Sequence, residues 1–243
     1  MKLQGKVAMI SGGSKGLGAD LARRFVEEGA SVSICARRPE AAASLASELT
    51  AAGGRCLVVG CDVTSEADVE RWVTATVEEL GGVDVLVNNA SVLGERLPIR
   101  DYPADVWRSV IDVNLTGAFL VAKACIAALS EGGSMIHVSS GVGDHGRPLW
   151  GAYCASKNGL EALSEMLAGE LAESGVRSNA VDPGAMRTVM RAAAYPQEDP
   201  AGVPTPYEIS DIFVYLASDD SAGVTGQRFR ARDFAWPETD AAS

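Results

Sequence analysis

The sequence predicts an α/β fold in which a doubly wound parallel sheet is covered by helices on both faces. Short runs rich in β-branched residues alternate with segments whose apolar residues recur every three or four positions. The turn after the first run is rich in glycine, which suits a ligand crevice at the carboxyl ends of parallel strands. With 243 residues, 47% of them hydrophobic, the chain is long enough for one large domain, 1–243.

Six segments are expected to form strands, at residues 6–11, 31–36, 55–63, 83–90, 134–140 and 177–183. Each is followed by a segment of helical periodicity, and the first helix is expected to end near Glu28. The helices expected at 104–129 and 151–173 carry apolar residues on more than one face. One face would cover the sheet and another would contact a second copy, so we expect a homo-oligomer.

Residues 185–206 interrupt this alternation with four prolines, at positions 196, 200, 204 and 206. Long loops in such folds usually cover a ligand, so we expect a substrate lid here. A surface connection without a role in binding is the alternative.

Composition excludes several classes of function. The formal net charge of −11, with no run of basic residues longer than two, disfavours nucleic-acid binding. The longest nearly apolar stretch, 117–129, is broken by Lys123 and is too short to span a bilayer, and the N-terminus has no signal-peptide core. Five cysteines without a C-x-x-C pair argue against a disulfide framework. We therefore expect a cytoplasmic protein without a membrane partner.

Metal binding is also disfavoured. His137 and His145 are the only histidines, and neither belongs to a cluster of cysteine, histidine and carboxylate residues at metal-ligand spacing. No metal site is predicted.

The glycine turn, Ser11 to Gly18, follows the first strand and opens the first helix. Its glycines at 12, 16 and 18 would let the backbone approach a pyrophosphate and present helix N-terminal amides to it. The spacing G-x-x-x-G-x-G differs from the commoner G-x-G-x-x-G, and any tight turn between strand and helix can use glycines.

Other polar residues follow neighbouring strands. Arg37 and Arg38 stand after the second strand, where a NAD-binding fold usually has an acid on the ribose. Asp62 follows the third strand and Asn89 the fourth, along the same crevice, where they could contact an adenine ring and its ribose. A helix N-cap and a polar turn are the alternatives for these two.

Tyr153 and Lys157 lie one helical turn apart, on the same face of a helix. Carbonyl reduction needs a proton donor to the oxygen, and a tyrosine would serve if its pKa fell from about 10 toward about 7. An ammonium group at about 4 Å would supply the required 4 kcal/mol or so. An ordinary amphipathic helix with a snorkelling lysine is the alternative.

These motifs, taken in order and with their spacing, resemble those of the short-chain dehydrogenase/reductase family. The match runs from Gly12 to the "TGQ" that begins at Thr225, and includes "NNA" from Asn88, "VNLTG" and "DPGAMRT". The resemblance implies a single Rossmann-type domain with a seven-stranded parallel sheet. It is weakest after "TGQ", where "RFRARDF" replaces the Val-Asp-Gly-Gly strand common in the family, and at Ser91, where glycine is usual.

The resemblance also implies the site residues. The catalytic set would be Asn114, Ser140, Tyr153 and Lys157, with Ser140 preferred to Ser139 because it lies 13 residues before the tyrosine. Asn114 would anchor a water that leads protons from Lys157 to solvent. The cofactor-binding set would be Gly12, Ser14, Lys15, Gly16, Leu17, Gly18, Arg37, Arg38, Asp62, Val63, Asn89, Ala90, Tyr153, Lys157, Pro183, Gly184 and Thr188.

Charge at the adenosine end favours NADP(H) over NAD(H). The second strand ends without an acid, and Arg37, Arg38 and Lys15 could bind a 2′-phosphate. We therefore expect an oxidoreductase that acts on a small carbonyl or secondary alcohol with NADP(H). A non-catalytic dinucleotide sensor, and an isomerase or dehydratase on the same scaffold, remain alternatives.

Overall fold

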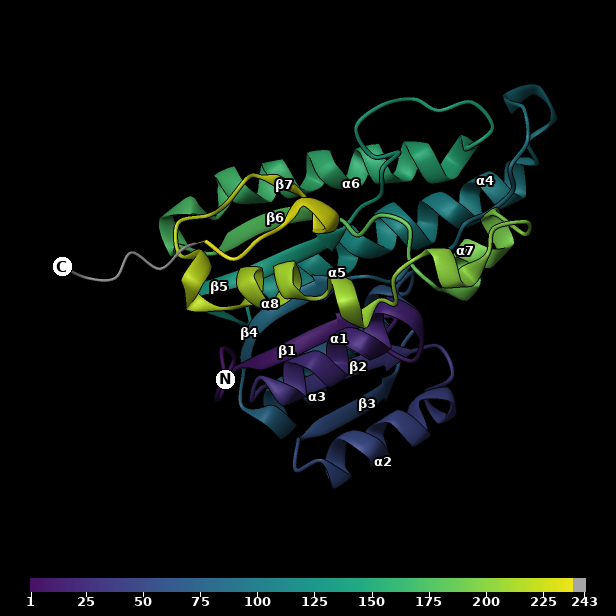
Figure 1. Cartoon of the computed structure of the whole chain (residues 1–243). Coiled ribbons are helices and arrows are strands. Elements are labelled where there is room, and N and C mark those ends of the chain that lie inside the picture. Colours follow the sequence, from purple (N-terminus) through teal and green to yellow (C-terminus); the bar gives the residue numbers. More distant parts are fainter. Residues whose placement is uncertain (238–243) are drawn as a thin grey trace.

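The computed structural model describes residues 1–237 and contains one seven-stranded parallel sheet (Figure 1). The strand order is β3-β2-β1-β4-β5-β6-β7. The strands are β1 (Val7–Ser11), β2 (Ser31–Ala36), β3 (Cys56–Gly60), β4 (Val83–Asn88), β5 (Leu129–Val138), β6 (Arg177–Asp182) and β7 (Arg228–Arg230). The order reverses between β1 and β4, which places the ligand crevice at the carboxyl ends of these two strands.

The strands are apolar on both sides because helices cover both faces of the sheet. All five residues of β1 are buried, and Met9 contacts the opposite side from Ala8 and Ile10. The register pairs Ile10 with Ile34 of β2 and with Val87 of β4. The predicted parallel sheet with helices on both faces is therefore confirmed.

The helices divide into two layers (Figure 1). One face of the sheet is covered by α1 (Gly16–Glu27), α2 (Ala43–Ala51) and α8 (Asp211–Ala217). The other is covered by α3 (Glu66–Leu80), α5 (Gly117–Ile126) and α6 (Gly151–Glu170), with α4 (Ala104–Ile111) packed against α6. A short helix, α7 (Val189–Ala194), lies outside these layers.

The helix expected at 104–129 differs from that expectation. A π-helical turn at Asp112–Thr116 separates α4 from α5, and α5 ends at Ile126. Leu129 instead begins β5, five residues before the expected start of that strand at residue 134. Periodicity could not show this, because one extra residue in a helical turn leaves the apolar pattern on either side intact.

The helical run Ala104–Ile126 is 23 residues long with a mean hydropathy of 1.5, enough by length and composition to cross a membrane. In this fold it packs against α3 and α6, and Val110, Val121 and Cys125 are fully buried in the protein core. Burial accounts for part of this hydropathy, whereas Phe119 and Ile126 of the same run are exposed.

The segment 185–206 is more regular than the proline-rich loop that was expected. It contains α7 and a 3₁₀ turn at Pro200–Gly202. Ala194, at the end of α7, packs in one cluster with Tyr153 and Trp150. The end of α7 therefore packs against the start of α6.

Candidate active site

The glycine turn forms a close cradle between β1 and α1. Gly12 and Gly16 have φ values of +66° and +56°, a region that favours glycine. A Cβ atom on Gly18 would lie 2.5 Å from the carbonyl oxygen of Gly12. The N-cap of α1 is Lys15, whose side chain does not cap the helix. The first amides of α1 therefore have no side-chain acceptor, and they could hold the phosphates of a dinucleotide.

Asn89 fixes the turn from the end of β4. Its Nδ2 donates to the carbonyl oxygens of Ser11, at 2.8 Å, and Gly12, at 3.2 Å. The Ser11 hydroxyl in turn accepts from the backbone amides of Asn89 and Ala90. Asn89 thus positions the turn rather than offering its side-chain amide to the adenine or ribose. The neighbouring Ser91 hydroxyl is buried and has no hydrogen-bond partner within residues 1–237.

At the adenosine end, Lys15, Arg37 and Arg38 are exposed. Within residues 1–237 no carboxylate lies within ion-pair distance of any of the three. Asp62 is not a helix N-cap, because Ser65 caps α3. The Asp62 Oδ1 atom instead accepts from the amide and the hydroxyl of Thr64.

The predicted catalytic pair lies on α6. Tyr153 and Lys157 are both buried, at 8% and 2% exposure. The Lys157 Nζ atom donates to the carbonyl oxygen of Val138 at 2.7 Å and lies 5.7 Å from the centroid of the Tyr153 ring. The strand end at Val138 therefore holds the ammonium group beside the phenol.

Burial sets the pKa values of this pair. It raises the pKa of Tyr153 to about 12, although a hydrogen bond with Ser140 acts in the opposite direction. Burial also lowers the pKa of Lys157 to about 8. The structure does not bear out the expectation that the pKa of the phenol falls toward 7, because burial raises this pKa and the ammonium group donates to a backbone carbonyl.

The two serines at the end of β5 have different partners. The Ser139 hydroxyl is buried and donates to Glu161 of α6. The Ser140 side chain lies close enough to Tyr153 to act against the rise in the pKa of the phenol. Of the two serines, Ser140 is therefore the one beside the phenol.

Asn114 lies in the π-helical turn and is buried. Its Oδ1 accepts from the amide of Val92 at 2.8 Å, and its Nδ2 donates to the Val92 carbonyl and to the Ser156 hydroxyl. Both side-chain amide hydrogens are used. A water-anchoring role would therefore fall to the second lone pair of Oδ1 or to the main-chain carbonyl.

The segment after β6 reaches back to the glycine turn. Gly184 has a φ value of +73°, and its amide donates to Asp182 at 2.9 Å. Thr188 caps α7, and its methyl group lies 3.6 Å from the position of a Cβ atom on Gly16. Pro183, Gly184 and Thr188 thus close one side of the predicted cofactor site.

One residue at the site was missed. The Arg228 Nε atom of β7 donates to Glu161 at 2.8 Å, and its Nη2 donates to the carbonyl oxygen of Ser140 at 3.1 Å. Asp144 and Asp182 also lie within 4 Å of this guanidinium group. The departure of "RFRARDF" from the family pattern was a signal that this segment differs, but nothing in it identified partners 67 and 88 residues away.

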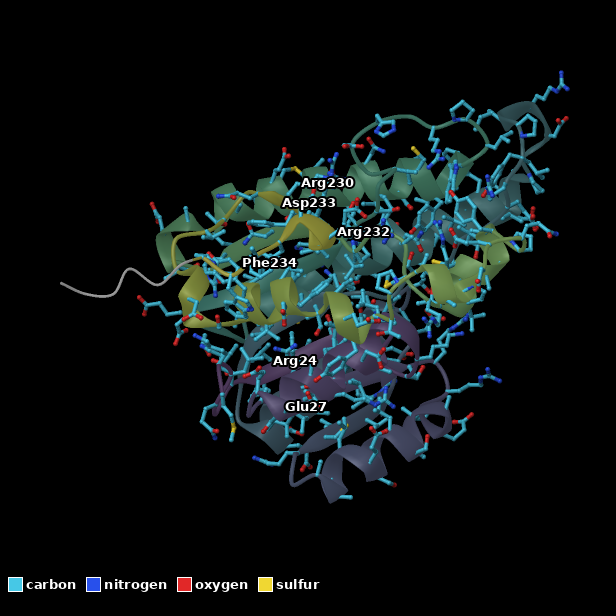
Figure 2. All side chains as sticks on the ribbon, in the orientation of Figure 1. Arg24, Glu27, Arg230, Arg232, Asp233 and Phe234 are labelled. Carbon is cyan, nitrogen blue, oxygen red and sulfur yellow. The ribbon has the colours of Figure 1, made fainter. Side chains whose placement is uncertain are left out.

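The same C-terminal segment touches a second part of the site. Figure 2 shows Arg230, Arg232, Asp233 and Phe234 along it. Arg232 donates to the carbonyl oxygen of Ala185 at 2.9 Å and packs against Gly184. The C-terminal segment therefore contacts both the loop after β5, at Ser140, and the turn after β6, at Ala185.

No group of three or more potential metal ligands occurs in the part of the chain that the structure describes. Burial lowers the pKa of His137 to about 4, so its imidazole is neutral. His145 is exposed and bonds to Asp144.

Comparison with known proteins gives a consistent result. The family model described as short chain dehydrogenase matches residues 6–199. An uncharacterised oxidoreductase of Methylorubrum extorquens is 36% identical over 242 residues, which are 95% of this chain and 97% of the relative.

Solved structures agree. A protein assigned as a short chain dehydrogenase from Pseudomonas syringae superimposes with a TM-score of 0.92 at 35% identity, covering 95% of this chain and 96% of that one. One from Shigella flexneri, described as complexed with NADP, gives 0.90 at 31% identity, covering 95% and 98%.

Proposed function

The chain belongs to the short-chain dehydrogenase family, and from this premise we propose that it transfers a hydride between NADP(H) and a carbonyl or secondary alcohol. The observation that carries the proposal is the buried pair of Tyr153 and Lys157 on α6, which lies beside the half-buried Ser140 after β5. Such an arrangement suits proton transfer to a carbonyl oxygen.

Tyr153 acts as the proton donor in this proposal. With a pKa of about 12, its phenol keeps its proton at neutral pH, so that the proton is present for transfer to a substrate oxygen. Ser140 binds the same oxygen and orients it. Lys157, held by Val138, stabilises the phenolate that forms when the proton leaves.

NADP(H) fits the residues that are present. The cradle at Gly18 leaves no room for a side chain, and the uncapped amides of α1 suit a pyrophosphate. Arg37, Arg38 and Lys15 suit a 2′-phosphate. The bound cofactor would supply the hydride. The relative from Shigella flexneri, described as complexed with NADP, supports the same choice.

Two further features belong to the proposal. The segment 185–206 acts as a substrate lid, because Ala194 and Tyr195 pack beside Trp150 and Tyr153. The chain also forms a homo-oligomer through the outer faces of α5 and α6, where Phe119 and Met166 are 45% and 55% exposed. A monomeric mass by light scattering at micromolar concentration would contradict the oligomer.

The test is oxidation of NADPH, followed by absorbance, with a panel of ketones, quinones, aldehydes and sugars. We expect turnover with at least one ketone and a lower dissociation constant for NADPH than for NADH. Binding of NADPH without turnover of any carbonyl would instead support a sensor.

A further inference from the structure

Three arginines and two aromatic rings gather at the mouth of the proposed substrate site. The guanidinium carbon of Arg96 lies 4.8 Å from the ring centroid of Trp150 and 5.1 Å from that of Tyr195. Arg147 lies 5.5 Å from the Trp150 ring, and Arg191 lies 3.8 Å from the Tyr195 ring. Aromatic faces attract cations, so these contacts fix the arginine side chains in place.

Trp150 joins this cluster to the catalytic tyrosine. Its ring centroid is 5.8 Å from that of Tyr153, and only 7% of the residue is exposed. The backbone that aims it is strained, because Leu149 has a φ value of +71°, rare for a bulky residue. Such strain concentrates at functional sites, where surrounding contacts hold it in place. Trp150 is thus a fixed platform between the phenol and two guanidinium groups.

The three arginines differ in whether a nearby carboxylate neutralises their charge. Arg191 forms an ion pair with Glu198 at 2.6 Å. Within residues 1–237, no carboxylate lies within 4 Å of Arg96 or Arg147. Two guanidinium groups without a carboxylate partner therefore lie beside the Trp150 ring, in a chain whose net charge is −11.

Arg96 could instead serve only to fasten the lid, because one of its Nη atoms donates to the carbonyl oxygen of Ala194 at 2.5 Å. That contact uses one of the five guanidinium donors and requires no neutralising charge. It also leaves Arg147 unexplained, since Arg147 contacts Trp150 from the loop before α6.

We propose that the substrate is an oxo- or hydroxy-carboxylate whose apolar or aromatic body lies against Trp150, with its carboxylate bound by Arg96 and Arg147. The planar fork of an arginine matches a carboxylate with two parallel hydrogen bonds. Val92, Leu93 and Met190 pack around Trp150 and Tyr153, which suits an apolar body. This inference rests on the proposed reductase function and specifies its substrate class.

The experiment compares acids with their methyl esters. The probes are aryl ketones with a carboxylate at several distances from the carbonyl, such as benzoylformate and 4-acetylbenzoate. Each pair is titrated into the NADP⁺-saturated protein and followed by tryptophan fluorescence, with Trp150→Phe used to identify the signal. The kcat/KM of each pair is measured with NADPH.

We expect at least one acid to bind ten-fold or more tightly than its ester. The double substitution Arg96→Gln and Arg147→Gln should erase that preference while leaving the binding of the ester within about two-fold. The matched control is Arg55→Gln, which removes one positive charge from an exposed arginine whose only side-chain partner within residues 1–237 is the carbonyl of Glu79. It should change neither affinity.

Two outcomes would overturn the inference. In one, no acid binds more tightly than its ester. In the other, the double substitution weakens acid and ester equally, as loss of a lid contact would. Reduction of neutral ketones without any preference for acids would leave the reductase function intact, whereas absence of turnover with every carbonyl would refute that function itself.

Discussion

The two ends of the crevice hold their polar side chains in different ways. At the adenosine end, Lys15, Arg37 and Arg38 are exposed, without a carboxylate partner in the described chain. At the reacting end, Lys157 is buried and donates to the Val138 carbonyl. Arg228 is mostly buried and forms an ion pair with Glu161. We therefore expect that cofactor preference can change without affecting the fold, whereas the proposed chemistry and folding depend on the same residues at the reacting end.

The largest effect is expected at Tyr153. Replacing it with phenylalanine removes the proton donor and little else, so kcat should fall by about 10²–10⁴-fold. The dissociation constant for NADPH should stay within a few-fold of the wild-type value. Steady-state kinetics and a fluorescence titration measure the two quantities, and equal activity of both proteins on the best substrate would sink the proposed mechanism.

Arg228→Met tests whether the reacting end depends on its buried contacts. The substitution leaves Glu161 and Asp182 without their cation, so the free energy of unfolding should fall by about 3 kcal/mol. The control is Arg230→Met, whose side chain is 60% exposed and 3.7 Å from Asp144. Its effect should stay within about 0.5 kcal/mol in urea unfolding. A similar change in the free energy of unfolding for both variants would show that the reacting end does not depend on the buried contacts of Arg228.

At the adenosine end, the double substitution of Arg37 and Arg38 by alanine should affect binding and leave stability unchanged. Charge-assisted contacts are worth about 1.5–3 kcal/mol each, so we expect the wild-type protein to prefer NADPH over NADH by tens-fold. The double substitution should remove most of this preference. Affinity for NADH should barely change. Titration of both cofactors decides the matter, and an equal or tighter dissociation constant for NADH in the wild-type protein would refute the assignment.

The smallest effect concerns the pH dependence of stability. Because burial lowers the pKa of Lys157 from 10.5 to about 8, the unfolded chain holds a proton between these pH values that the folded protein has lost. Stability contributed by this group therefore rises as pH increases from about 8.

The comparison variant is Lys157→Met, which lacks this proton. Relative to it, the wild-type free energy of unfolding should increase by about 1 kcal/mol per pH unit between pH 8 and 10. Urea unfolding across this range measures the difference, and a flat difference would contradict the assigned pKa.

What the sequence predicted well was local. The alternation of strands and helices, the glycine turn, and the positions of Tyr153 and Lys157 one turn apart follow from spacing along a few tens of residues. The family and the parallel sheet are confirmed. The roles of individual site residues remain predictions.

The features that the sequence did not predict depend on contacts between segments that are distant along the chain. The three-residue strand β7 forms because it pairs with β6, which no propensity of "RFR" indicates. The π-helical turn places Asn114 against Val92 and Ser156. The raised pKa of Tyr153 follows from burial, which the helix pattern alone underestimated.

The position of β7 has a consequence for synthesis. The ribosome makes the glycine turn, the serine, the tyrosine and the lysine before residue 228, so a growing chain holds its reacting groups early. The carbonyl of Ser140 and the carboxylate of Glu161 still lack their cation at that stage. Until Arg228 has been made and β7 pairs with β6 at the edge of the sheet, the carbonyl of Ser140 lacks this hydrogen bond. The contacts of the reacting end are therefore completed only after β7 has been made.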